Sequence, residues 1–320
     1  MSEPAFRHVD TNGVTLRVAI KGEGPLVLFV HGFPESWYSW RHQLEAVSAA
    51  GFTAAAVDVR GYGGSDKPHP VEAYDMQSLT GDMAGVAEAL QPSAPAVIVG
   101  HDWGAPIAWN TALLHPDRFR AVAGLSVPYI PQGEVVFIDA VRKFFTEQGL
   151  FFYQVYFQDE GVAEAEAERD PREWVARMMY SISGDVPPGD YFDKPLGATF
   201  LEGLPDPAPV GWLTEDDLDF YEAEFKSSGF RGPLNRYRNW HRDNAFLRAN
   251  SDQIIRQPSL FIGGTRDLVL KMYPGDMVAA MKPNLPGLRG AHLLEGCGHW
   301  TQQERADEVN RLLLDWLATL

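Results

Sequence analysis

The chain has 320 residues, of which 45% are hydrophobic and 22% are charged, a composition ordinary for a globular protein with a substantial core. Its formal net charge of −16 argues against nucleic acid or an anionic membrane surface as a partner. The polar segment 1–10 predicts no signal peptide, and no apolar run approaches the length of a membrane span. The single cysteine, Cys297, excludes an intramolecular disulfide. We therefore expect a cytoplasmic protein.

The first third of the chain alternates between apolar runs typical of strands and amphipathic runs typical of helices. The predicted strands are 15–20, 26–30, 53–59, 96–100 and 121–126, and the predicted helices are 75–90 and 105–114. The run 26–30 is almost wholly apolar, which favours a central strand buried on both faces. Regular alternation of this kind predicts a parallel sheet flanked by helices.

The alternation stops near Pro128 and resumes after residue 246. Between these points the chain reads as helical, aromatic and irregular, with a capping box at Thr214 that opens a helix ending at Gly229. The stretch 183–211 is rich in proline and glycine, which predicts a functional lid or a disordered linker. The later predicted elements are strands 259–263 and 290–294 and a helix at 305–317. The sequence thus predicts a core domain formed by 1–130 and 247–320, with a mainly helical cap domain, 131–246, inserted between its two parts.

The pattern Gly100-x-Asp102-x-Gly104 lies between the predicted strand 96–100 and the helix 105–114. It fits a nucleophile elbow, in which small residues permit a sharp strand-to-helix turn that pushes the middle side chain into a cleft. Aspartate at such a turn is also a common helix N-cap, which is the alternative interpretation. The flanking glycines and the residues described below favour a nucleophile.

An aspartate at the elbow changes the chemistry that the site can perform. A carboxylate is already ionised at neutral pH, so it needs no base before it attacks a carbon atom. The product of that attack is an alkyl ester on the protein. Epoxides and alkyl halides, which carry a strained ring or a good leaving group, are the expected substrates.

The ester on Asp102 needs a base that activates water, and His299 is the candidate. It lies in the glycine-rich turn 296–300, just after the last predicted strand. Asp267 follows the strand 259–263 and is the candidate acid that orients the imidazole. In folds that carry a nucleophile elbow of this kind, the nucleophile, the acid and the histidine follow one another along the chain in the same order as residues 102, 267 and 299. The rival position for the acid, the loop 127–133, contains no carboxylate.

The segment His31-Gly32-Phe33-Pro34 follows the central predicted strand. In folds with a nucleophile elbow, the loop after this strand supplies one backbone donor of the oxyanion hole, and the residue after the nucleophile supplies the other. We assign these donors to Phe33 and Trp103, although an ordinary turn would read the same way. They would stabilise the oxyanion that forms when water attacks the ester.

Opening an epoxide also requires an acid that protonates the departing oxygen. Tyrosine suits this role because its pKa near ~10 keeps it protonated at neutral pH. The cap contains two tyrosine-bearing runs, 151–157 and 232–238. From the pattern alone, tyrosines that merely pack are the commoner case. The pattern also does not separate Tyr153 from Tyr156, since residues i and i+3 share a helix face.

Motifs along nearly the whole chain resemble those of the epoxide hydrolases of the α/β-hydrolase fold, most closely the hydrolase domain of the soluble epoxide hydrolases. The motifs are HGFPESWYSWR (31–41), GYGGSDKP (61–68), GHDWGAP (100–106), YQVYFQDEGVAEAE (153–166), FKSSGFRGPLNRYRNW (225–240) and GCGHWTQQE (296–304). The last three are more specific than the elbow alone.

The resemblance implies an α/β-hydrolase fold and an epoxide hydrolase. The sequence shows neither a metal-ligand cluster nor a nucleotide-binding glycine loop, so we expect no cofactor and no metal. The resemblance implies Asp102 as nucleophile, with Asp267 and His299 as its partners. It also implies Tyr153 and Tyr237 as the pair that activates the epoxide oxygen. The remaining implied residues form a hydrophobic substrate pocket: Pro34, Trp37, Val269 and Trp300.

Two other functions fit part of the pattern. A haloalkane dehalogenase shares the fold and the aspartate, and Trp103 could hold a halide, but a departing halide needs no proton from Tyr153 or Tyr237. A non-catalytic ligand-binding protein of this fold need not retain a nucleophile, an acid and a base. The expected partners are therefore a small apolar epoxide and water, and a monomer and a homodimer are equally compatible with the sequence.

Overall fold

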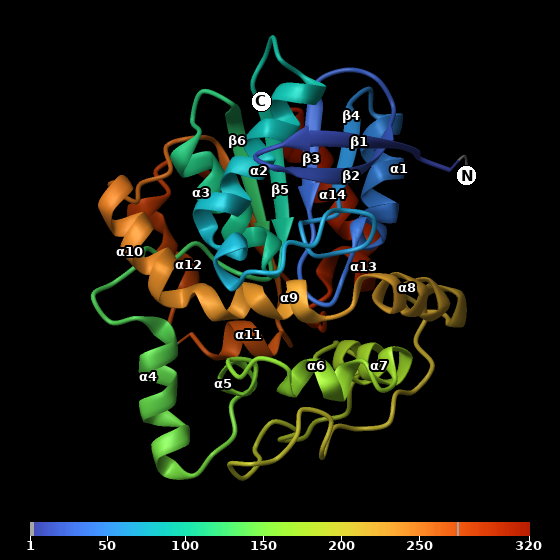
Figure 1. Cartoon of the computed structure of the whole chain (residues 1–320). Helices are drawn as coiled ribbons and strands as arrows, with labels where there is room; N and C mark the ends of the chain where they lie inside the picture. The colour runs from blue at the N-terminus through green and yellow to red at the C-terminus, as the bar shows by residue number, and fades with distance from the viewer. Residues whose placement is uncertain (1–2, 274) are drawn as a thin grey trace.

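The computed structural model describes residues 3–273 and 275–320, and at its centre lies an eight-stranded sheet (Figure 1). The strand order is β1-β2-β4-β3-β5-β6-β7-β8. Strand β2 is antiparallel to both β1 and β4, and the pairs from β4 to β8 are all parallel. The strands are β1 (Ala5–Thr11), β2 (Val14–Lys21), β3 (Leu26–Val30), β4 (Thr53–Val57), β5 (Ala96–His101), β6 (Phe119–Leu125), β7 (Ser259–Gly264) and β8 (Leu288–Leu294). The predicted α/β-hydrolase architecture is confirmed.

Strands β2 to β8 agree with the predicted strands to within two residues at either end. Strand β1 was not predicted. It lies at the edge of the sheet, and most of its side chains are exposed, with Val9 buried. Because a mostly exposed edge strand carries little hydrophobic alternation, composition and periodicity gave no signal for it.

Two pairs of helices cover the two faces of the sheet. These helices are α1 (Arg41–Ala49) and α14 (Ala306–Leu317) on one face, and α2 (Met76–Leu90) and α3 (Gly104–Leu114) on the other. Along the central strand β3, Leu28 and Val30 pack toward α2 and α3, whereas Val27 and Phe29 pack toward α1 and α14. Both faces of β3 are therefore buried, as its apolar sequence predicts.

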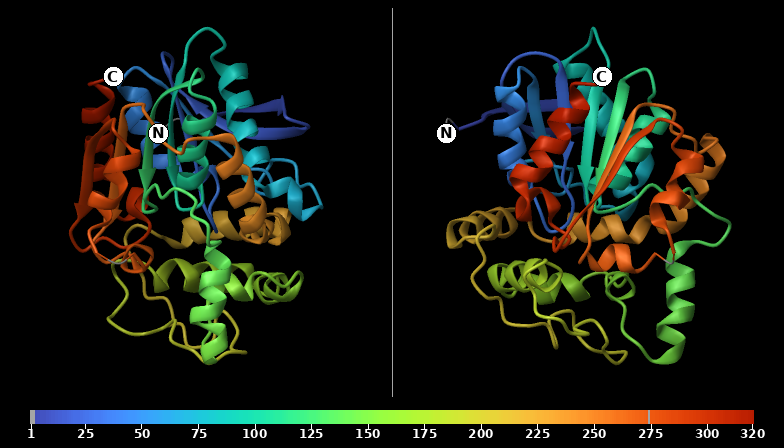
Figure 2. Two further views of the ribbon diagram at one scale, coloured as in Figure 1. Left: turned by 90° about the vertical axis from the view of Figure 1, so that its left-hand side faces the viewer. Right: turned by 180° about the vertical axis from the view of Figure 1, so that it is seen from behind.

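The chain between β6 and β7 forms a layer beyond the carboxyl ends of the parallel strands (Figures 1 and 2). Its helices are α4 (Phe137–Phe144), α5 (Tyr153–Tyr156), α6 (Val162–Ala167), α7 (Pro171–Ser181), α8 (Glu215–Ser228), α9 (Arg231–Asn235) and α10 (Trp240–Asn250). The predicted capping box is present, since the Thr214 side chain accepts a hydrogen bond from the backbone of Asp217 and α8 ends at Gly229. The predicted domain boundary at 246/247 falls inside α10, which packs against α2.

The stretch 183–211, called here the lid segment, contains neither a helix nor a strand, and every one of its residues is described. It is nevertheless packed against the rest of the cap. Phe200 is buried, and the Glu166 carboxylate accepts hydrogen bonds from the backbone of Phe200 and Leu201. Of the two predicted alternatives, a lid fits this packing and a disordered linker does not.

Three short helices complete the second half of the core: α11 (Leu268–Lys271), α12 (Met277–Met281) and α13 (Thr301–Glu304). They follow β7 or β8 and therefore border the carboxyl edge of the sheet, where the cap lies. In the part of the chain that is described, no helix combines the length and the apolar character needed to cross a membrane.

Candidate active site

Asp102 stands at a tight turn between β5 and α3. Its backbone has a φ of +50°, a conformation that non-glycine residues seldom adopt. A Cβ atom at Gly100 would lie 1.9 Å from the carbonyl oxygen of Gly104, and one at Gly104 would lie 2.0 Å from that of Val30. A side chain at either position would clash with the backbone, so both positions require glycine. The two glycines permit the sharp elbow that projects Asp102 from the edge of the sheet.

The two carboxylate oxygens of Asp102 have different partners. The backbone N–H of Phe33 donates a hydrogen bond to Oδ1 over 2.8 Å. Oδ2 lies 3.2 Å from Nε2 of His299. One oxygen is thus held by a backbone donor from the loop after β3, while the other faces the imidazole.

His299 lies between Asp102 and Asp267. Its Nδ1 is 3.0 Å from each carboxylate oxygen of Asp267, and both side chains are buried. The Asp267 carboxylate also accepts a hydrogen bond from the backbone N–H of Val269 over 2.8 Å, which fixes its orientation. The structure therefore brings the three predicted residues into one hydrogen-bonded line, with Nδ1 directed at Asp267 and Nε2 at Asp102.

The charges in this line support one another. Burial acts to raise the pKa of Asp102, but the hydrogen bond and charge of His299, helped by His101 and the Phe33 N–H, bring it below its ordinary value. Burial acts to lower the pKa of His299, but Asp267 and Asp102 hold it well above its ordinary value. In the unliganded site, an ionised Asp102 and a protonated His299 are therefore the favoured states.

Tyr153 and Tyr237 line the same cavity as Asp102 and His299. Their rings are 6.3 Å apart and nearly perpendicular, and they come from α5 and from the short 3-10 helix Arg236–Asn239. Burial and the nearby Asp102 charge raise the pKa of both phenols, so both carry a proton at neutral pH. Tyr156 instead donates a hydrogen bond to Glu166 over 2.9 Å and is not among the lining residues.

The cavity has a volume of about 450 Å³. Its inner wall is mainly apolar, with side chains from both the core and the cap: Phe33, Phe151, Phe152, Met178, Phe200 and Val269. Several lining residues of the lid segment and of α11 are exposed, among them Asp190, Asp193 and Lys271, and they mark the opening to solvent. A small apolar molecule therefore fits this space better than an extended polar one.

Of the four predicted pocket residues, Val269 lines the cavity, and the structure places the other three elsewhere. Trp37 packs edge-on against Phe6 and belongs to the core beneath α1. Trp300 packs behind His299 and donates its indole N–H to the carbonyl of Met179 over 2.7 Å. Pro34 is buried just beyond the cavity wall, after Phe33.

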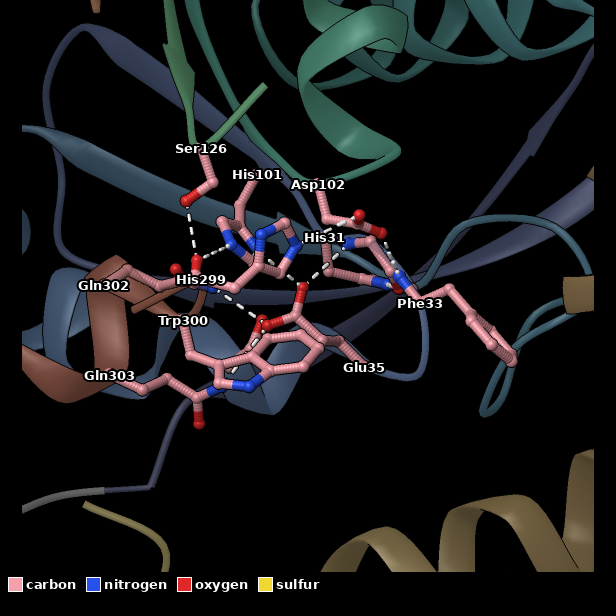
Figure 3. A network of polar contacts seen from close by, with 12 residues as sticks. His31, Phe33, Glu35, His101, Asp102, Ser126, His299, Trp300, Gln302 and Gln303 are labelled. Atoms are coloured by element: carbon pink, nitrogen blue, oxygen red, sulfur yellow. Dashed lines mark hydrogen bonds and ion pairs between the residues drawn. The ribbon is translucent and has the colours of Figure 1, made fainter. Parts of the chain in front are cut away.

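A second polar network, not predicted from the sequence, supports the backbone of His299 (Figure 3). The carboxylate of Glu35 lies between the ring of His101 and the side-chain amides of Gln302 and Gln303. Nε2 of His101 is 2.8 Å from the carbonyl oxygen of His299, which also accepts a hydrogen bond from Ser126 over 2.6 Å. The signal available in the sequence was a histidine inside the apolar run before Asp102.

The beginning of the lid segment is bonded to the histidine loop. The Glu304 carboxylate accepts hydrogen bonds from the backbone of Gly184, Gly298 and Trp300, and the N–H of His299 donates to the carbonyl of Ile182. The Arg266 guanidinium donates to the carbonyls of Gly184 and Val186. Ile182 and the first residues of the lid segment, up to residue 186, are therefore attached to the core beside His299.

Comparison with known proteins agrees with this geometry. A family profile described as "alpha/beta hydrolase fold" matches residues 25–306. Epoxide hydrolase A of Mycobacterium tuberculosis is 44% identical, over 100% of this chain and 99% of its own length. The bifunctional epoxide hydrolase 2 of Sus scrofa is 39% identical over 96% of this chain, which spans 54% of that longer protein.

Solved structures give the same result. An epoxide hydrolase from an endophytic Streptomyces has a TM-score of 0.95 and 50% identity, covering 99% of this chain and 96% of that one. Epoxide hydrolase A from Mycobacterium thermoresistibile has a TM-score of 0.92 and 44% identity, with 98% of each chain covered. The chain therefore belongs to the α/β-hydrolase family and, within it, to the epoxide hydrolases. The expected family is confirmed.

Proposed function

We propose that this protein converts epoxides to vicinal diols through an ester on Asp102, and that residues 131–246 act as its cap. The observation that carries the proposal is that one apolar cavity is bordered by the nucleophile Asp102 and by the proton donors Tyr153 and Tyr237. A carboxylate and two protonated phenols in one cavity supply what epoxide opening needs.

In the first step, Oδ2 of Asp102 exchanges its contact with His299 for a bond to an epoxide carbon, whereas Oδ1 stays on the Phe33 N–H. The carbon–oxygen bond of the ring breaks, and the departing oxygen receives hydrogen bonds from Tyr153 and Tyr237 and takes a proton from one of them. The result is a hydroxyalkyl ester and a tyrosinate. Neither a metal nor a cofactor enters this step.

In the second step, His299 takes a proton from water, and the hydroxide attacks the ester carbonyl carbon. Asp267 holds the imidazole by Nδ1 and stabilises its positive charge. We assign the oxyanion to the donors of Phe33 and Trp103. Collapse of the intermediate breaks the ester bond, releases the diol and returns the protons to the starting groups, so the net reaction adds one water.

The charge on Asp102 sets the order of these steps. While Asp102 is ionised it helps to hold the pKa of His299 high, which disfavours the neutral imidazole. Ester formation removes that charge, so the pKa of His299 falls and its proton passes to the tyrosinate that ring opening has left. The neutral imidazole can then take a proton from water. The base is thus activated only after the electrophile has been captured.

The substrate class follows from the walls of the cavity. Phe33, Phe151, Phe152 and Phe200 favour epoxides with an aromatic or branched aliphatic substituent. We also propose a cytoplasmic location, with which the lack of any intramolecular disulfide in a chain that has one cysteine is compatible.

The test compares diol formation by the wild type and by Asp102→Ala on a panel of aromatic and aliphatic epoxides, with 1-haloalkanes alongside. We expect diol from the wild type and a loss on the order of 10⁴-fold or more in the variant, since nothing else can form the ester. Halide release without diol would instead identify a dehalogenase. No reaction with either class, together with tight binding of an apolar ligand, would identify a binding protein.

A further inference from the structure

Gln154 contacts the tyrosine that the proposed function uses as an acid. Its side-chain Nε2 lies 2.8 Å from the phenolic oxygen of Tyr153. Gln154 is buried, and it follows Tyr153 directly on α5. Within the described residues, the Tyr153 hydroxyl accepts this hydrogen bond and takes part in no other.

The direction of this hydrogen bond decides where the Tyr153 proton points. A phenol has one O–H donor and accepts through its oxygen, whereas an amide nitrogen only donates. When Gln154 donates to the oxygen, the Tyr153 proton must point elsewhere, and the cavity with Asp102 is the open side. If the amide were reversed, the Tyr153 O–H would donate to Gln154 and be unavailable to a substrate.

The same bond acts on the tyrosinate that ring opening produces. Hydrogen bonds to a charged acceptor are about twice as strong as those between neutral groups. The bond from Gln154 lowers the pKa of Tyr153 against the larger effect of burial, which raises it. Trp103 packs edge-on against Tyr237, with ring centroids 5.1 Å apart, and its side chain lowers the pKa of Tyr237 against the larger effect of burial. Each phenol therefore has a neighbouring side chain that favours loss of its proton.

The backbone around Gln154 is held in place as well. Nε2 of Gln158 donates to the carbonyl of Gln154 over 2.8 Å and to the carbonyl of Tyr237 over 2.9 Å. One side-chain amide thus bridges the two tyrosine-bearing segments. The Gln154 backbone is thereby fixed relative to both tyrosine-bearing segments, which a positioning role requires. Its side chain is held by the bond to Tyr153, because its buried Oε1 has no hydrogen-bond partner among the described residues.

We propose that Gln154 is a positioning residue that directs the Tyr153 proton into the cavity by donating a hydrogen bond to its oxygen. This role rests on the proposed function. Gln154 does not touch the substrate. It acts only through Tyr153, so its effect falls on ester formation and not on substrate binding or on hydrolysis of the ester.

The experiment compares the wild type with Gln154→Met, Gln154→Glu and the control Gln148→Glu. Gln148 is an exposed cap residue whose side chain donates to the carbonyl of Phe144, and it does not line the cavity, so its variant introduces the same charge away from the site. The rate of ester formation is measured in single turnovers by tryptophan fluorescence between pH 5.5 and 8.5 (about three pH units around neutrality). Trp103, next to Asp102, is the expected reporter.

We expect Gln154→Met to slow ester formation by about 10- to 100-fold, with substrate affinity unchanged. Gln154→Glu should be slower still at high pH, because an ionised carboxylate accepts the Tyr153 proton. It should recover as the pH falls, because a protonated carboxyl can donate to the phenol, and burial raises the pKa of such a carboxyl into the measured range. Gln148→Glu should match the wild type throughout.

Two results would overturn the role of Gln154 alone: both Gln154 variants form the ester as fast as the wild type, or Gln154→Glu shows a loss that does not vary with pH. A wild type that forms neither ester nor diol would overturn the proposed function and this role with it. Circular dichroism on each variant confirms that it is folded before rates are compared.

Discussion

The two halves of the site are built in different ways. In the core half, Asp102, Asp267 and His299 each follow a strand, β5, β7 and β8, so the sheet itself sets their spacing. In the cap half, Tyr153 and Tyr237 sit on short helical segments joined by side-chain hydrogen bonds such as those of Gln158. The core half is therefore fixed by backbone pairing and the cap half by a few side chains.

In the proposed mechanism the two halves serve different steps. The cap supplies the protons for opening the ring, and the core supplies the nucleophile and the base that releases the product. Removing the two tyrosines of the cap should therefore stop the reaction before the ester forms. Removing His299 from the core should stop it after the ester has formed. The predictions below test that division.

The largest effect is expected from replacing Tyr153 and Tyr237 together by phenylalanine. Both phenols keep their protons at neutral pH, so the double variant loses every assigned donor to the epoxide oxygen. Ring opening should be abolished, with no adduct by intact-mass measurement and no diol by chromatography. Tyr156→Phe is the control, since Tyr156 bonds to Glu166 away from the cavity. Near-normal turnover in the double variant would show that another acid operates.

A smaller loss is expected for His299→Gln, and at the other step. Turnover should fall by about 10²- to 10⁴-fold, the usual contribution of a general base. Asp102 can still attack, so the ester should accumulate and the protein mass should rise by the mass of one substrate. The control is Asp102→Ala under the same conditions, which should gain no mass. If His299→Gln also gains none, the assignment of His299 to the second step is wrong.

The smallest effect concerns the lid segment and appears in stability. Lys194 is buried, its ammonium group donates to the carbonyls of Thr199 and Phe200, and its nearest aromatic ring is Phe151, 5.0 Å away. Burial lowers the pKa of Lys194 from 10.5 to about 8. Between these two values the unfolded chain binds more protons than the folded one, so this residue makes stability rise with pH across that window.

The measurement compares the melting temperature of the wild type with that of Lys194→Met from pH 7 to pH 10 (a range of about three units across the window). The melting temperature of the wild type, relative to that of the variant, should rise by about 1–3 °C as the pH rises through the pKa of Lys194. Effects of other titrating groups cancel in the difference. A constant difference would mean that the carbonyls and aromatic rings keep the ammonium group protonated, and that the cap tolerates this buried charge without a penalty.

The same contrast explains what the sequence could predict. Strands β2 to β8 and the positions of Asp102, Asp267 and His299 follow from local patterns, because each depends on a strand and the turn after it. Strand β1 was missed because its side chains are mostly exposed. Spacing could not separate Tyr153 from Tyr156. The choice depends on the bond from Tyr156 to Glu166 and on a cavity whose walls come from distant segments of the chain.

The pocket was the least predictable part for the same reason. Trp37 and Trp300 lie within motifs that border the site. The Trp37 side chain nevertheless packs in the core, and the Trp300 side chain packs behind His299. Which way a large side chain turns is decided by packing against distant segments, here Phe6 and Met179. The Glu35–His101 network was missed because it joins four separate parts of the chain.

The attachment of residues 182–186 beside His299 limits which part of the lid segment can be altered safely. A substitution at Gly184 would disturb the loop that carries His299, because the Glu304 carboxylate accepts hydrogen bonds from the backbone of both Gly184 and Gly298. A substitution at Arg266 would remove the side-chain bonds to the carbonyls of Gly184 and Val186. Residues 187–193 border the cavity beyond these bonds, and most of them face solvent. Variation in substrate preference, whether by natural divergence or by directed evolution, can therefore accumulate in this outer stretch while the hydrolytic machinery stays intact.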